Sequence, residues 1–512
     1  MSEAERNPLR EGMSEERTVP PAALVVFGAS GDLTKRKIFP AIYNLARERH
    51  LPAGFAAIGV ARRPKPDFAA EMGDNIGKFS RHKPVDEATW GELEKRISYV
   101  QGNFDDAATF DKLKKELERV DQEHGTGGGR VFYLAVAPDQ VPQIVEGLAR
   151  AKLVVPPSDD RSAPRQHVVV EKPFGEDLQS ARALNRELGH HLDERQIYRI
   201  DHYLGKETVQ NLLVFRYGNT IFEPLWSQHY VDHVQITVAE DIGVEGRGSF
   251  YEKVGITRDI VQNHALQVLT MVAMEPPSSW HADAVRDEKV KVLRTLRRIR
   301  GKEVLERTVR GQYGPGTVRG DKVPGYRQEP DVAPESDTET YVAMRVALDS
   351  WRWGGVPFYV RSGKRMAKRL AEVVLQFKPL PHGLFRGAAG ENAEPNALVV
   401  RIQPDEGIAL RFATKVPGGG MALRDVSMDF RYGTAFGSST PEAYERLILD
   451  AMRGDATLFT RADEVEAQWS FIDDIRNGWR DHQAPVVSYA AGSWGPEEAE
   501  RILLPGDVWR KP

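Results

Sequence analysis

The sequence predicts a protein of two successive parts: a doubly wound α/β domain around a parallel sheet, then a larger α+β domain with a mainly antiparallel sheet. Three observations lead to this prediction. The chain has 512 residues, which is more than one hydrophobic core usually serves. As far as about residue 200, short apolar runs alternate with amphipathic stretches of helical length. Beyond that point, extended segments alternate apolar with polar residues.

The apolar runs of the first part are continuous and rich in β-branched residues. They are Ala23–Phe27, Phe55–Val60, Ile97–Val100, Val131–Val136 and His167–Val170. Strands that are apolar on both faces are typical of a parallel sheet covered by helices on both sides. The charged stretch before them, residues 1–20, is predicted to be a disordered tail. The first domain is predicted to span residues 21–203.

The second part, residues 204–512, has a different pattern. Thr340–Leu348 and Leu398–Gln403 alternate apolar and polar residues, which indicates antiparallel strands with one wetter face. Two long helical patterns interrupt these strands, at Tyr251–Met274 and Pro441–Met452. An α+β substrate-binding and oligomerisation domain is therefore expected here.

The composition excludes several classes of function. The chain contains no cysteine, which rules out disulfides, thiolate catalysis and cysteine-bound metals, and no metal site is predicted. The formal net charge is -4, so neither a nucleic-acid nor a membrane partner is expected. No apolar run approaches the roughly 18 residues of a membrane helix, and the N-terminus lacks the apolar core of a secretory signal. A cytoplasmic location is expected.

One basic stretch, Lys289–Arg300, leaves nucleic-acid binding open as an alternative. It lacks the interleaved aromatic residues on which bases stack, and the domain around it has no matching charge. The stretch is therefore interpreted as a solvated helix face.

The first strand runs into a glycine-containing turn, Gly28–Thr34, which a helical segment follows. Such glycines let the backbone approach a pyrophosphate, whose charge the helix N-terminus stabilises, so the turn predicts a Rossmann-like dinucleotide site. Arg62 and Arg63 follow the second strand, where enzymes that use NAD usually place an acid, and a guanidinium suits the 2'-phosphate of NADP. The predicted coenzyme contacts are Gly28, Ser30, Gly31, Asp32, Leu33, Lys35 and Arg62.

Three further segments combine charged groups with turns: Glu171–Gly175, Arg199–Glu207 and Arg258–His264. The first two follow predicted strands of the parallel sheet, at the edge where open α/β sheets bind ligands. Together with the glycine turn, they resemble consecutive motifs of the glucose-6-phosphate dehydrogenase family: GASGDLTKRK, EKPFG, RIDHYLGKE, GRGSFYEKVGITRDIVQNH, VPFYVRSGK and PEAYERLILDAMRGD. These motifs stand in the family's order and cover nearly the whole chain outside the tail.

The resemblance implies a catalytic pair. His264 would be the general base that removes the hydroxyl proton from carbon 1 while hydride leaves for NADP, and Asp201 would hold its tautomer. An imidazole is suited to this proton transfer near neutral pH, and a carboxylate partner stabilises the imidazolium that forms. From the pattern alone His264 also reads as a core residue, because Ile256, Ile260, His264 and Val268 form one helical stripe.

The resemblance also implies a site for glucose 6-phosphate. His202, Tyr203 and Lys206 would bind the phosphate, and Lys364 and Arg369 would add positive charge. Glu240 and Asp259 would accept hydrogen bonds from sugar hydroxyls, and Gln403 would contact the sugar. Lys172 would lie between coenzyme and substrate. Asp259 and His264 are five residues apart, about 140° round a regular helix, so the sequence does not show how both reach one sugar.

The family resemblance further implies a homodimer or homotetramer. Eukaryotic members hold a second, structural NADP in the C-terminal domain; Arg361, Arg401 and Asp429 match that site, whereas Leu370, Val374 and Trp494 replace its basic residues. Two alternatives to the main interpretation stay open. One is a related hexose-6-phosphate dehydrogenase that uses both NAD and NADP, and the other is a sugar-phosphate sensor without activity.

Overall fold

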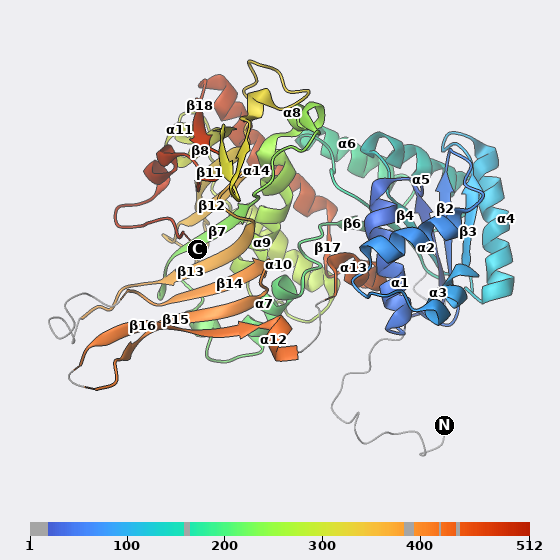
Figure 1. The fold of residues 1–512 in the computed structure, drawn as a ribbon, viewed down its shortest axis with the longest axis horizontal. Coiled ribbons are helices and arrows are strands. Elements are labelled where there is room, and N and C mark those ends of the chain that lie inside the picture. The colour runs from blue at the N-terminus through green and yellow to red at the C-terminus, as the bar shows by residue number, and fades with distance from the viewer. Residues whose placement is uncertain (1–18, 158–163, 383–393, 419–420, 437–440, 512) are drawn as a thin grey trace. The chain divides into compact units, whose positions relative to one another are not determined.

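The computed structural model describes residues 19–157, 164–382, 394–418, 421–436 and 441–511, so the expected tail, residues 1–20, lies outside them except for its last two residues (Figure 1). The chain forms two compact units. Unit 1 comprises Met1–Lys172, Arg186–Ile200 and Tyr444–Phe459, and unit 2 comprises Pro173–Asn185, Asp201–Ala443 and Thr460–Pro512.

Unit 1 is built on a seven-stranded sheet with the order β17-β6-β5-β4-β1-β2-β3. Its strands are β1 (Ala22–Phe27), β2 (Phe55–Ala61), β3 (Ile97–Gln101), β4 (Arg130–Leu134), β5 (Gln166–Val170), β6 (Ile197–Ile200) and β17 (Phe459–Thr460). The pairs from β3 through β1 to β6 are all parallel. Every residue of β1, β2 and β4 is buried, as their continuous apolar sequences require. The predicted parallel sheet is confirmed.

The strand order reverses between β1 and β4, so the connections run in opposite directions on the two sides of β1. Since such crossovers are right-handed, the helices before and after β3 cover opposite faces of the sheet. The helices between these strands along the chain are η3 (Thr34–Ile38), α1 (Phe39–Arg47), α2 (Phe68–Phe79), α3 (Glu87–Glu94), α4 (Ala107–His124), η4 (Pro138–Gln140), α5 (Val141–Arg150), α6 (Leu178–Gly189) and η5 (Glu194–Gln196). Most of α6 belongs to unit 2.

A late segment of the chain, Tyr444–Phe459, also belongs to unit 1. It contains most of α13 (Ala443–Arg453), whose Glu445 is buried and accepts hydrogen bonds from Asn44 Nδ2 and Arg81 Nε, both at 2.8 Å. This buried acid is fully partnered, which is the condition for keeping its charge inside a protein. The polypeptide therefore returns to the first sheet near its end, although this segment lies within the predicted second domain.

Unit 2 is built on a nine-stranded sheet with the order β16-β15-β14-β13-β7-β12-β11-β8-β18. Its strands are β7 (Val231–Ala239), β8 (Thr308–Gly314), β11 (Tyr341–Val346), β12 (Phe358–Gly363), β13 (Leu370–Phe377), β14 (Ala397–Gln403), β15 (Gly407–Lys415), β16 (Leu423–Arg431) and β18 (Val486–Ala490). The β7–β12 and β8–β18 pairs are parallel and the others are antiparallel. The prediction of a mainly antiparallel sheet is confirmed. A separate pair consists of β9 (Gly316–Val318) and β10 (Asp321–Val323).

Helices accompany this sheet. They are α7 (Glu207–Tyr217), η6 (Glu223–Leu225), α8 (Gly248–Ile256), η7 (Thr257–Ala265), α9 (Leu266–Ala273), α10 (Ala282–Thr295), α11 (Glu303–Arg307), η8 (Tyr326–Gln328), α12 (Tyr432–Phe436), α14 (Ala462–Asp481) and η9 (Glu497–Ile502). The η7 segment packs on β7 and β12, and α10 packs on α9 and α14. In the described part of the chain, no helix combines the length and hydropathy needed to cross a membrane.

The basic stretch Lys289–Arg300 is largely neutralised by acids of α14. Lys289 Nζ lies 2.8 Å from Glu464 Oε2, and both side chains are fully buried. Arg298 and Arg300 both contact Asp474. The expectation of a solvated face is therefore wrong for Lys289, because its charge is used to join α10 to α14. These pairings favour a structural role for the stretch over nucleic-acid binding.

Candidate active site

The centre of the site is a buried pair, Asp201 and His264. Asp201 directly follows β6, and His264 lies in η7; the Nδ1 atom of His264 is 2.5 Å from Asp201 Oδ1, and the two residues are 3% and 1% exposed. The backbone N–H of Tyr203 also donates to Oδ1 at 2.9 Å. Because a carboxylate can only accept, Nδ1 carries the hydrogen, and Nε2 is the nitrogen that can accept a proton.

The charge state of Asp201 follows from this contact. Burial by itself would raise the pKa of Asp201, but the positive charge and hydrogen bond of His264, with help from His202 and the Tyr203 N–H, lower it to about 2. Asp201 is thus an anion at any ordinary pH. A fixed anion beside an imidazole stabilises the protonated ring, which is the property that a general base needs from its partner.

The backbone around His264 is a π-helix, η7, in which hydrogen bonds close over five residues instead of four. In this geometry residues five apart lie closer to one another round the helix axis than they do in a regular helix. Asp259 and His264 have this spacing. The wider turn therefore explains how both side chains approach one site, a question that the sequence left open.

Aromatic rings surround the pair. The Tyr203 ring stacks on His264 with centroids 4.5 Å apart, and the His202 ring meets His264 edge-on at 4.4 Å. The Lys206 ammonium lies 5.5 Å from the centre of the Tyr203 ring. The three residues predicted to hold the phosphate thus lie together, and the ammonium is at the distance typical of a cation–π contact.

The end of the unit 2 sheet brings four more predicted residues to the same place. The parallel register pairs Ala239 of β7 with Gly363 of β12, so the next residues, Glu240 and Lys364, lie side by side, with Lys364 Nζ 2.6 Å from Glu240 Oε2. The antiparallel register pairs Ala239 with Leu370 and Ala371 with Gln403, which places Arg369 and Gln403 at this end too.

Contacts link this sheet end to the ring cluster. Gln403 Nε2 lies 3.4 Å from the Tyr203 hydroxyl, and Arg369 donates to Gln403 Oε1 at 3.5 Å. Burial raises the pKa of Tyr203, and the negative charges of Glu240, Asp201 and Asp259 raise it further. Gln403, Arg369 and the carboxylates of Glu240 and Asp259 therefore lie near one phenol.

Tyr251 in α8 was not among the predicted site residues. Its ring lies 5.1 Å from the Lys364 ammonium, and burial together with the charges of Asp259 and Glu240 raises the pKa of its hydroxyl. Within the described residues, this buried hydroxyl has no hydrogen-bond partner, and neither has Asp201 Oδ2. Both atoms are therefore available for a hydrogen bond to a ligand. Tyr251 is part of the GRGSFYEKVG motif, which is the sequence signal that could have drawn attention to it.

Among the residues that the structure describes, two groups of side chains have the composition of a cation site. The ligand atoms of Asp201, His202 and His264 lie within 4.8 Å of one another, as do those of Asp232, His233 and Asp507. In the first group the Asp201–His264 hydrogen bond occupies the Nδ1 atom and Oδ1. In the second, His233 contacts both carboxylates and its Nε2 faces Gln235 Nε2 at 3.1 Å. In both groups, the side chains thus already interact with one another through hydrogen bonds or ion pairs.

The glycine turn of unit 1 lies at the point where the strand order reverses, next to β4. Gly28 has φ +80°, and a Cβ there would come within 2.1 Å of the Ala135 carbonyl oxygen. Only glycine fits this close approach. The Gly31 N–H donates to the Gly28 carbonyl at 2.8 Å, and Thr34 Oγ1 donates to it at 3.1 Å. The turn has the place and backbone form of a dinucleotide loop.

The charged residues predicted for this loop have different partners. Lys35 pairs with Glu71 at 2.8 Å, and Asp32 pairs with Arg36 at 2.8 Å, so both already have an ion-pair partner. Ser30 and Leu33 lie in the turn and are half-buried. Arg62 is exposed at the end of β2, and in the described ranges no partner of its guanidinium is found. Arg62 is therefore the predicted cation that is most available to an anion.

Lys172 follows β5 and ends the first of the three segments of unit 1. The residue before it, Glu171, is half-buried, and the burial of its carboxyl group raises its pKa to about 7 against the opposing effects of Tyr133, Lys172 and Tyr444. The Tyr133 hydroxyl donates to Glu171. These tyrosines come from β4 and α13, so no local sequence signal could have revealed the network.

The residues that match the second nucleotide site of eukaryotic relatives are engaged within the chain. Arg361 is 1% exposed, and its guanidinium lies 4.6 Å from the Trp509 ring centre and 5.3 Å from that of Trp494. Arg401 is paired with Asp429. The positive charge of Arg361, which a second nucleotide would need, is thus already in contact with two aromatic rings.

Comparison with known proteins gives one consistent result. Residues 25–211 match the family model described as glucose-6-phosphate dehydrogenase, NAD binding domain, and residues 213–510 match the corresponding C-terminal domain. The chain is 45% identical to a glucose-6-phosphate 1-dehydrogenase of Chlamydia muridarum over 96% of its length and 97% of the relative's. It is 46% identical to one of Aggregatibacter actinomycetemcomitans over 96% and 97%.

Solved structures agree with these relatives. A glucose-6-phosphate dehydrogenase in complex with its substrate glucose 6-phosphate superposes with a TM-score of 0.86 at 34% identity, covering 96% of this chain and 99% of that one. The enzyme of Mycobacterium avium superposes with a TM-score of 0.80 at 36% identity and the same coverage.

Proposed function

The chain belongs to the glucose-6-phosphate dehydrogenase family, and we propose that it oxidises D-glucose 6-phosphate to 6-phospho-D-glucono-1,5-lactone with NADP as the hydride acceptor. The observation that carries this proposal is the buried Asp201–His264 pair, next to which Lys206, Lys364 and Arg369 supply positive charge. A proton acceptor beside a cluster of cations is what the oxidation of a phosphorylated sugar requires.

In the proposed reaction His264 acts as the general base. Its Nε2 takes the proton of the carbon-1 hydroxyl as the carbon–hydrogen bond breaks, and the ring becomes a cation that Asp201 stabilises. The bound nicotinamide supplies the acceptor for the hydride. Loss of hydride from carbon 1 turns the hydroxyl into a strong acid, so proton removal and oxidation proceed together.

The remaining residues would position the sugar. His202, Tyr203 and Lys206 would bind the phosphate, and Arg369 would add charge. Glu240, whose carboxylate is held by Lys364, and Asp259 would accept hydrogen bonds from sugar hydroxyls. The Tyr251 hydroxyl, which is buried without a partner in the described structure, is well placed to donate to the same ligand. Gln403 and Lys172 complete the proposed contacts.

For the coenzyme, we propose the turn from Gly28 to Lys35, including Ser30, Gly31, Asp32 and Leu33. The fit rests on the close backbone approach at Gly28 and on the unpaired Arg62 at the end of the adjacent strand, where the 2'-phosphate of NADP would lie. Because Trp494 and Trp509 enclose Arg361, one tight NADP site per chain is proposed. Calorimetry that finds two tight equivalents would contradict this stoichiometry.

The proposed activity is the first oxidative step of the pentose phosphate pathway, in the cytoplasm. A homodimer or homotetramer is proposed as well, and the exposed edge strand β16 supports it. Val426, Met428 and Phe430 alternate along this strand and are 37%, 62% and 38% exposed. Alternate residues face the same side of a strand, and an exposed apolar row on an edge strand favours association with a second copy.

Initial rates of NADPH formation test the proposal. They are measured with glucose 6-phosphate and with free glucose, each with NADP and with NAD. We expect fast turnover only with the phosphorylated sugar and a preference for NADP. Equal rates with both coenzymes would favour a dual-specificity hexose-6-phosphate dehydrogenase. Tight binding of glucose 6-phosphate without turnover would favour the sensor.

A further inference from the structure

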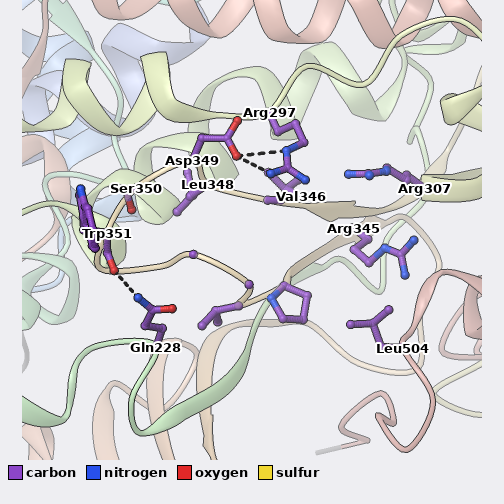
Figure 2. Close-up of a pocket in the computed structure, with 15 residues that line it drawn as sticks. Gln228, Arg297, Arg307, Arg345, Val346, Leu348, Asp349, Ser350, Trp351 and Leu504 are labelled. Carbon is purple, nitrogen blue, oxygen red and sulfur yellow. Dashed lines mark hydrogen bonds and ion pairs between the residues drawn. The ribbon is translucent and has the colours of Figure 1, made fainter.

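A cavity lies in unit 2, away from the residues described so far (Figure 2). Its volume is about 650 Å³, within the range of small-molecule sites. It is formed by the end of β11, the loop that leads from there to β12, and neighbouring side chains of α11 and the segment after α10. None of its lining residues has a role in the proposed reaction.

Arginines from three different segments line this cavity: Arg297 after α10, Arg307 at the end of α11 and Arg345 on β11. Asp349 is the acid among the lining residues, and it is hydrogen-bonded to Arg297 at 2.6 Å (Figure 2). Three cations and one anion leave a net charge of two positive units on the wall. This excess is concentrated on Arg307 and Arg345.

These two arginines lack good counterions. The one ion-pair partner of Arg307 in the described ranges is Glu303, at 3.9 Å, although the Arg307 side chain is only 21% exposed. Arg345 is half-buried and, as far as the structure describes the chain, has neither an ion-pair nor a hydrogen-bond partner. Like charges that are partly removed from water raise the energy of the fold unless an anion joins them. A guanidinium fork is suited to phosphate oxygens.

An aromatic platform lies at the other end of the cavity. Figure 2 shows Trp351 on the side opposite Arg307 and Arg345. The Trp351 residue is 96% exposed, and its carbonyl accepts a hydrogen bond from Gln228 Nε2 at 2.6 Å, which holds the loop. A fully exposed indole at the edge of a cationic cavity offers its face for stacking, as in sites that bind nucleic-acid bases.

We propose that this cavity binds a nucleoside polyphosphate, with the phosphates on Arg307 and Arg345 and the base stacked on Trp351. The ligand must be both anionic and aromatic to use the two ends, and a cavity of about 650 Å³ accommodates a single nucleotide.

The proposed site is separate from the substrate site. Pro357 lines the cavity and directly precedes β12, whose other end leads to Lys364. Six residues of strand separate them by roughly 20 Å. The glycine turn that we propose for the coenzyme belongs to unit 1, whereas every residue of this cavity belongs to unit 2.

Calorimetry on the full-length protein tests the proposal, with NADP present at about ten times its dissociation constant so that the coenzyme site is filled. The probes are ATP, tripolyphosphate and adenosine. We expect one equivalent of ATP to bind, tripolyphosphate to bind more weakly, and adenosine to bind weakest. Arg345→Gln and Arg307→Gln should each weaken ATP and tripolyphosphate by about tenfold or more, the effect of a lost charge-assisted hydrogen bond.

Trp351→Ala tests the binding of the base separately from the binding of the phosphates. It should weaken ATP by about tenfold, since stacking on an aromatic side chain contributes that much, and leave tripolyphosphate unchanged. Arg480→Gln is the matched control, because Arg480 is 73% exposed and does not line the cavity. It should bind ATP like the unmodified protein. Arg345→Lys keeps the positive charge but loses the forked guanidinium, so it should bind ATP with intermediate affinity. If Arg345→Gln does not fold, Arg345→Lys replaces it in the test.

The proposal is overturned if no ATP binds beyond the NADP-filled site, or if ATP affinity is the same in Arg345→Gln and Arg307→Gln as in Arg480→Gln. Equal affinity for ATP and tripolyphosphate in the unmodified protein would also overturn it, because the site would then recognise phosphate alone. Turnover of glucose 6-phosphate without ATP should be unchanged in all four cavity variants, since none alters a residue of the proposed reaction.

Discussion

Asp201→Asn is the most direct test of how the buried pair works. The substitution removes the negative charge next to His264 but leaves an amide of nearly the same shape. In the unmodified protein the Asp201 carboxylate accepts the Nδ1 hydrogen at 2.5 Å, inside a site that is almost closed to water. If Asp201 stabilises the imidazolium that forms during proton removal, the loss should fall on the chemical step.

The magnitude follows from the pKa of Asp201. Burial acts to raise it, yet His264, with help from His202 and the Tyr203 N–H, brings it from the ordinary 3.8 to about 2. At about 1.36 kcal/mol for each pKa unit, the net shift corresponds to roughly 2 to 3 kcal/mol in favour of the charged form. Because the interaction with His264 is mutual, the protonated His264 should lose a stabilisation of this order in the variant. We therefore expect kcat to fall by roughly 10-fold to 100-fold.

The assay is the initial rate as a function of glucose 6-phosphate and pH. KM should change much less than kcat, because the lost interaction acts mainly in the transition state. The acidic limb of the kcat profile should move to lower pH, since the imidazolium is less stable without the anion.

A matched carboxylate-to-amide control is Asp474→Asn, whose partners are Arg298 and Arg300 and which should leave both kcat and the pH profile unchanged. A well-folded Asp201→Asn variant that kept its kcat and its acidic limb would refute the assignment.

Other changes probe separate parts of the molecule. His264→Asn should lower kcat by about 10² to 10⁴ with little change in KM, the usual effect of losing a positioned base. Arg62→Ala should weaken NADP by about 1.5 to 3 kcal/mol, measured by calorimetry, and hardly affect NAD; equal losses would show that Arg62 supports the fold. Lys206→Ala should mainly raise KM for glucose 6-phosphate, because a phosphate contact acts in ground and transition states alike. Burial lowers the pKa of His167 from 6.5 to about 4, so the unfolded chain takes up this proton first as the pH falls. The free energy of unfolding should therefore drop by roughly 3 kcal/mol between pH 6.5 and 4, and denaturant titration of His167→Asn should show a shallower decline.

The parallel sheet could be predicted from the sequence because a few consecutive residues are enough to indicate a buried strand. Strands β1 and β2 are short apolar runs that no polar residue interrupts, and β1, β2 and β4 are buried along their whole length. The glycine turn was equally accessible, since it stands between an apolar run and a segment of helical length, and Gly28 adopts a positive φ that favours glycine. Such features depend on neighbouring residues and on backbone sterics alone.

Pairings over long distances could not be predicted in this way. The helix α14 was not expected, because its buried Glu464 is polar and finds its partner, Lys289, far away in the sequence. The return of Tyr444–Phe459 to unit 1 has the same cause, since Glu445 is stabilised by Asn44 and Arg81. The sequence around a buried charged residue does not show which distant residue pairs with it.

The site itself depends on both kinds of information. Family motifs indicated which residues belong to it, but their grouping follows from the register of the second sheet. Glu240 and Lys364 meet because Ala239 pairs with Gly363, and a shift of one residue would turn one of the two side chains to the other face. His264 reaches the same place through a π-helix, which a pattern based on regular helical spacing cannot detect. The helical stripe of apolar residues around His264 predicted a core position, and the His264 ring is indeed buried. Burial and catalysis are compatible here because the ring is hydrogen-bonded to Asp201, and the exclusion of water strengthens the interaction on which the proposed proton transfer depends.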